Sequence, residues 1–102
     1  MKNLVELIEQ KYNEGKLEDI LLFIQKELEI LLNKIKATNS IGEVMILFDT
    51  LEKIQFILAK AVFNDNLVVP PNIKKFIYDF DRIDDEEIRY YLYSKIKEGQ
   101  SL

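Results

Sequence analysis

The sequence predicts an all-α protein, a small helical bundle of about five helices that forms a single domain over residues 1–102. Apolar residues recur at steps of three and four along most of the chain, which is the spacing of amphipathic helices. No segment alternates convincingly at a period of two, although the short run NLVV at 66–69 could pair briefly as a strand. Hydrophobic residues make up 48% and charged residues 31%, a composition typical of folded globular chains.

Two helices are expected before residue 37. The first lies near residues 3–14 and stops at Gly15. The second lies near residues 17–36, where apolar positions step alternately by four and three in a heptad-like seam: Leu17, Leu21, Ile24, Leu28, Leu31 and Ile35.

The third helix is expected near residues 41–63. Ser40 followed by Glu43 has the spacing of a capping box at its start. Its core-facing stripe is Val44, Leu47, Phe48, Leu51, Ile54, Leu58 and Val62.

Two shorter helices complete the bundle. The run LVVPP at 67–71 is expected to be extended, because proline disfavours helix in the residue before it. Pro71 suits the first turn of a fourth helix near 71–81, and a fifth begins among the acids at 84–87 and ends at Gly99. The inward positions of these two helices are Ile73, Phe76, Ile77, Phe80, Ile88, Tyr91, Leu92 and Ile96.

A candidate internal repeat relates residues 1–36 to residues 70–98, bridged by the long helix near 41–63. A shift of 69 places Leu4, Leu7 and Ile8 on apolar residues, and a shift of 68 does the same from Ile20 onward. The alternative is chance, because any two amphipathic helices joined by a short turn produce such matches. A true repeat implies two similar helical-hairpin motifs packed together with a groove between them.

Six carboxylates fall within residues 79–87. A calcium loop of the EF-hand kind fails there: counted from Asp79, its fifth, sixth and twelfth positions are Ile83, Asp84 and Tyr90. A magnesium site with two carboxylates remains an alternative. Acids at a helix start are favoured by capping and by the helix dipole, so we expect a helix N-terminus, with no metal and no cofactor.

Several apolar residues lie outside the core stripes. A surface helix needs one apolar stripe, and the two long helices each have a second one. Either the third helix is central, or the surplus side chains meet a partner, and a second copy of the chain is the simplest candidate. The predicted partner-binding residues are Phe23, Ile30, Met45, Phe56, Phe63, Tyr90 and Tyr93.

The residue types argue against catalysis and against nucleic acid. The chain has no histidine and no cysteine, which removes the commonest general base and most nucleophiles, and its three glycines form no phosphate loop. A formal net charge of −4 makes nucleic-acid binding unlikely on electrostatic grounds. The best basic clusters are Lys34 with Lys36 and Lys74 with Lys75. No apolar run is long enough to span a membrane.

Lysine outnumbers arginine 12 to 2, and isoleucine and leucine each occur 14 times, as in LEDILLFIQKELEILLNKIKATNS at 17–40. In this character the chain resembles the orphan proteins of filamentous viruses that infect hyperthermophilic archaea. The resemblance implies a non-enzymatic accessory role in the host cell and transfers no site residue.

The function predicted from the sequence is that of a non-enzymatic protein–protein interaction module in the cytoplasm, the host cytoplasm if the protein is viral. It would bind a peptide or partner protein in an apolar groove between helical motifs, and a homodimer is possible. The alternatives are a nucleic-acid-associated regulator and an acidic inhibitor of a host protein.

Overall fold

The computed structural model describes residues 3–82, and all their regular structure is helical. Its elements are α1 (Leu4–Asn13), the 3-10 turn η1 (Leu17–Ile20), α2 (Leu21–Ala37), α3 (Ile41–Phe63) and α4 (Pro71–Arg82). The all-α prediction is confirmed. The fifth helix expected from residue 84 and most of the second half of the predicted repeat lie outside the described residues.

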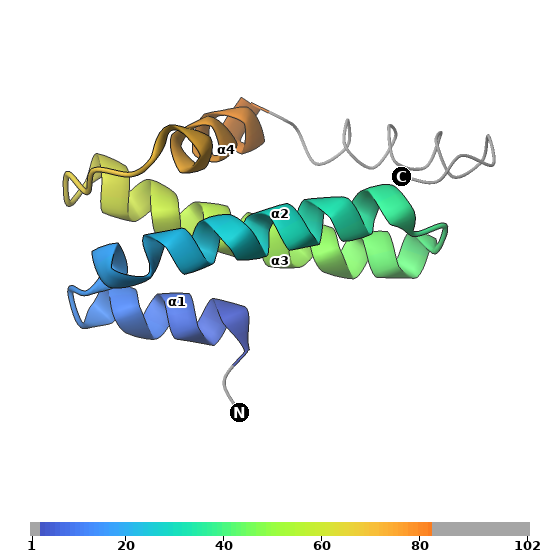
Figure 1. Ribbon diagram of the computed structural model, residues 1–102, viewed down its shortest axis with the longest axis horizontal. Coiled ribbons are helices and arrows are strands. Elements are labelled where there is room, and N and C mark those ends of the chain that lie inside the picture. The colour runs from blue at the N-terminus through green and yellow to red at the C-terminus, as the bar shows by residue number, and fades with distance from the viewer. Residues whose placement is uncertain (1–2, 83–102) are drawn as a thin grey trace.

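Helix α3 occupies the centre of the bundle. It contacts α1, α2 and α4, and Figure 1 shows α1 and α4 on opposite sides of it with α2 lying across it. The expected stripe of α3 faces inward: Leu51, Ile54 and Leu58 are fully buried. No polar or charged side chain is buried among the described residues, so burial of apolar surface provides the main stabilisation of the fold.

The chain reverses between α1 and α2 through Gly15. The amide of Lys16 donates to the carbonyl of Lys11 at 2.9 Å, and Gly15 adopts φ 69°, a left-handed conformation that glycine takes without strain. The predicted continuous helix from residue 17 is wrong in its first turn, because Leu17–Ile20 form a 3-10 turn and Ile20 leaves the helical region at φ −118°, ψ 18°. Apolar spacing cannot separate one 3-10 turn from one α turn over four residues.

The capping box before α3 is half formed. The hydroxyl of Ser40 accepts a hydrogen bond from the Glu43 amide at 3.2 Å, as predicted. The second bond of a capping box, from the Ser40 amide to the Glu43 carboxylate, is not formed. The carboxylate accepts from the Thr38 hydroxyl at 2.9 Å, while the Ser40 amide donates to the oxygen of that same hydroxyl at 3.1 Å. Thr38 therefore completes the cap.

Besides the packing of their core faces, α3 and α4 are joined by two aromatic contacts and one hydrogen bond. The aromatic rings of Phe48 and Phe80 stack with their centroids 5.3 Å apart, and the rings of Phe63 and Tyr78 meet edge to face at 5.7 Å. The side-chain amide of Gln55 donates to the carbonyl of Ile77 at 3.3 Å. Residues 66–70, before α4, form no helix or strand.

Candidate partner-binding surfaces

The five predicted partner-binding residues that the structure describes are all exposed. Their exposed fractions run from 39% for Met45 to 59% for Phe56, with Phe23, Ile30 and Phe63 in between. Tyr90 and Tyr93 lie outside the described residues. Within residues 3–82, then, these surplus apolar side chains keep 39% or more of their surface exposed even though α3 is central, although Phe63 also packs against Tyr78 of α4.

The exposed residues form two separate surfaces. Phe23 and Ile30 lie on the side of α2 away from Leu28, whereas Met45, Phe56 and Phe63 lie on the outer side of α3. The two stripes therefore belong to different helices, α2 and α3, which pack against each other. We call Met45, Phe56 and Phe63 the α3 stripe. Of the five residues, Phe56 lines the groove described next.

An elongated groove between α1 and α3 adjoins the α3 stripe at Phe56. It consists of two hollows of about 490 Å³ and 450 Å³ that share Val5, Glu9 and Lys53. Three further carboxylates line it, those of Glu6, Asp49 and Glu52. The rest of the lining is apolar or uncharged: Asn3, Leu4, Thr50, Gln55, Phe56 and Ile57. With four carboxylates and one ammonium group, the lining carries a formal charge of −3, and we call it the acidic groove.

The carboxylates of the acidic groove are mostly uncompensated. Asp49 pairs with Lys53 at 3.1 Å, but Glu6, Glu9 and Glu52 form no ion pair with any residue from 3 to 82. Nor do they converge: the described part of the chain has no group of three acids placed to hold a metal ion. The groove therefore presents an extended negative surface, not a chelating centre.

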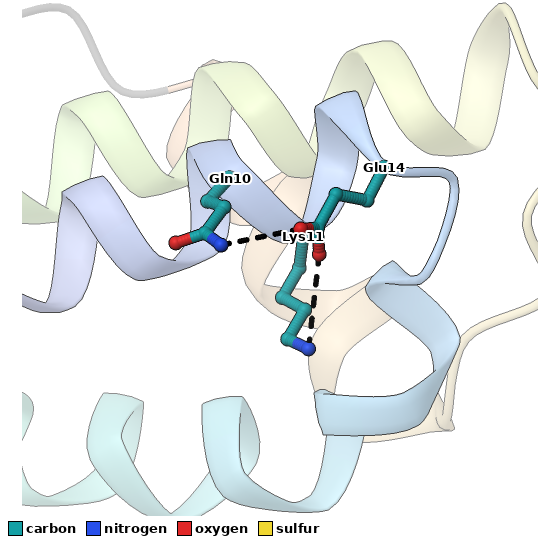
Figure 2. Close-up of polar contacts among 3 residues, drawn as sticks. All are labelled: Gln10, Lys11 and Glu14. Carbon is teal, nitrogen blue, oxygen red and sulfur yellow. Dashed lines mark hydrogen bonds and ion pairs between the residues drawn. The ribbon is translucent and has the colours of Figure 1, made fainter.

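Glu14, at the end of α1, differs from these glutamates because neighbouring side chains compensate its charge. Its carboxylate accepts a hydrogen bond from the Gln10 side chain at 3.2 Å and lies 3.8 Å from the ammonium group of Lys11. Figure 2 shows both neighbours reaching the same carboxylate. Local pairing of this kind leaves less negative charge available to a partner than the isolated glutamates of the acidic groove offer.

A second groove, between α2 and α4, is more apolar. It measures about 490 Å³, and its lining combines five apolar side chains with five polar ones: Leu28, Leu32, Ile73, Phe76 and Phe80, and Gln25, Glu29, Asn72, Lys75 and Asp79. At its rim, Lys75 and Asp79 pair at 2.6 Å. The sequence did not reveal this groove, because its lining comes from two helices, α2 and α4, that are far apart in the chain.

Tyr12 links α1 to the loop after α3. Tyr12 and Asp65 line the same small hollow, and hydrogen bonding to Asp65, partial burial and the negative charge of Asp65 raise the pKa of Tyr12 above its usual value of 10.0. The neutral phenol is therefore the form that the folded protein favours. In the described residues, no helix is long and apolar enough to cross a membrane.

Comparison with known proteins gives one family. The sequence model of a family described as "Immunity protein CdiI-like" matches residues 1–98. The chain belongs to this family. The CdiI-like match covers all four described α-helices and both predicted tyrosines, and no curated protein or solved structure matches the chain.

Membership of the CdiI-like family supports the prediction that this chain acts by binding another protein. It says nothing about the resemblance to archaeal virus proteins, which stays a prediction from composition. The sequence had no signal for the acidic groove as a unit, since the carboxylates of α1 lie at least 40 residues from those of α3 in the chain.

Proposed function

We propose that this chain is an immunity protein that binds one toxin protein and holds it inactive, without catalysing a reaction itself. Family membership over residues 1–98 supports the class of function. The observation that carries the binding mode is the α3 stripe, whose Phe56 ring is 59% exposed on a helix otherwise anchored at the centre of the bundle. A large aromatic side chain on a rigid helix can bury much area at little entropic cost.

The nucleic-acid alternative has less support. Lys34 and Lys36 are exposed at the end of α2, but Lys75 is already paired with Asp79, and the groove with the highest charge is negative. Phosphate backbones are repelled by such a surface.

The test begins with capture of proteins from nuclease-treated lysate of the source organism on the immobilised chain. Each captured protein is then expressed in bacteria alone and together with this chain. We expect one of them to stop growth alone and to be tolerated when the chain is co-expressed. If no captured protein is toxic, or co-expression gives no protection, the proposed function is wrong.

A titration separates binding from catalysis. Toxin activity measured against increasing amounts of the purified chain should fall linearly and vanish at one chain per toxin. Complete inactivation by far less than one equivalent would show turnover, and the non-enzymatic part of the proposal would be wrong.

Phe56→Ala tests the α3 stripe in the same growth assay. Leu22, which is 76% exposed on α2, supplies the matched control Leu22→Ala. Protection should be lost or weakened for Phe56→Ala and kept for Leu22→Ala. Equal protection by both variants would remove Phe56 from the binding surface.

A further inference from the structure

We propose that the acidic groove between α1 and α3 binds a positively charged, arginine-bearing segment of the partner protein, with Phe56 contacting that segment at one end. This inference rests on the proposed function and adds the chemistry of the partner to it. The family description names no surface and no partner chemistry.

Both walls of the groove contribute acids at the spacing of one helical turn. Glu6 and Glu9 are three residues apart on α1, and Asp49 and Glu52 are three residues apart on α3. Residues at that spacing are neighbours on a helix surface, so each wall presents a pair of carboxylates, of which Asp49 is already paired with Lys53. Two such walls match an extended segment with several cations better than they match one small ion.

The charge of the groove selects among possible occupants. Its lining carries −3 of the formal −4 of the whole chain, so nucleic acid and acidic proteins are repelled. A second copy of this chain is repelled for the same reason, which disfavours a homodimer through this groove. A basic protein segment is the occupant that complements it.

Phe56 adds an apolar contact next to the acids. The ammonium group of Lys60 lies 4.4 Å from the centroid of its ring, so this ring face already accommodates a cation. An arginine side chain stacks on aromatic rings and also pairs with carboxylates through two parallel hydrogen bonds. Arginine is therefore the side chain that can contact both the Phe56 ring and the carboxylates of the groove.

The first experiment needs no toxin. The full chain, isotopically labelled, is titrated with a short peptide of alternating arginine and leucine and, separately, with one of alternating glutamate and leucine. We expect the arginine peptide to shift the amide resonances of Val5, Glu9, Glu52 and Phe56, with binding that weakens as salt is added. Shifts confined to the α2–α4 groove, or equal binding of both peptides, would overturn the proposal.

Charge-matched variants then test the acids themselves. Glu9→Gln with Glu52→Gln removes two charges from the groove, and Glu18→Gln with Glu29→Gln removes two exposed charges elsewhere. The first pair should weaken peptide binding by about tenfold and the second by less than about twofold. Circular dichroism confirms that each variant is folded. Equal losses would show that net charge alone is responsible and would overturn the assignment to the groove.

The same variants distinguish this inference from the proposed function. If the chain neutralises a toxin and Glu9→Gln with Glu52→Gln leaves toxin affinity unchanged, the immunity function stands and the groove assignment fails. If the groove binds the arginine peptide while no toxin is neutralised, the groove assignment stands and the proposed function fails.

Discussion

The ammonium group of Lys60 lies 4.4 Å from the centre of the Phe56 ring, one helical turn away on α3. The pair is an intramolecular version of the contact that we propose for the partner. Lys60 also adds a positive charge close to a groove whose lining is negative. An incoming arginine must therefore displace Lys60 from the ring face or share the ring with it.

Removing the Lys60 charge should strengthen binding of a cationic segment. Lys60→Gln frees the ring face and removes a repulsive charge, and we expect about a two- to fivefold rise in affinity for the arginine peptide. Calorimetric titration measures it, with Lys26→Gln on α2 as the control for loss of one positive charge. Unchanged or weaker binding relative to that control would contradict the proposed role of Phe56.

Leu51 should be among the most costly core positions. It is fully buried on α3, so Leu51→Ala removes apolar contacts and leaves a cavity, with an expected loss of about 2–5 kcal/mol in the free energy of unfolding. Ile46→Ala, on the same helix but 69% exposed, should change it by less than about 0.5 kcal/mol. Urea unfolding followed by circular dichroism compares the two. Similar values would contradict the burial of the α3 core face.

The start of α3 depends on the Ser40 hydroxyl. Ser40→Ala removes the acceptor for the Glu43 amide, and we expect a loss of about 1 kcal/mol of stability. Ser40→Asp supplies another capping oxygen and should keep most of it. Thermal unfolding of both variants makes the comparison. A loss as large for aspartate as for alanine would mean that the cap is not the cause.

The pairing of Tyr12 with Asp65 predicts an alkaline transition. The pKa of Tyr12 is raised in the folded protein, so its stabilising contribution is complete below the unfolded pKa of about 10 and is lost as pH rises through the folded pKa. Ultraviolet titration of tyrosine ionisation should place Tyr12 lower in Asp65→Asn, which removes the negative charge, than in the natural sequence. Tyr12→Phe identifies which part of the titration belongs to this residue. An identical Tyr12 titration with and without the Asp65 charge would contradict the pairing.

Local signals in the sequence located most of the helices. The break at residues 38–40, the Ser40 cap and Pro71 place the ends of α2, α3 and α4 within a residue or so of where the structure has them. The 3-10 turn at Leu17–Ile20 was missed, because four residues of apolar spacing fit either helix type. Thr38 was missed as part of the cap, since its role depends on how the loop before α3 folds back.

For the candidate site, helical periodicity identified exposed apolar positions such as Phe23 and Phe56 but not their grouping. The angle of a residue around its own helix shows whether it faces the core, and that angle follows from the sequence alone. Which helix lies beside a given exposed face depends on how the core faces of the helices pack together. The sequence therefore determined the helices, their core faces and the surplus apolar stripe on α3. Only tertiary packing placed α1 beside α3 and brought Glu9 and Glu52 to one groove with Phe56 in its lining.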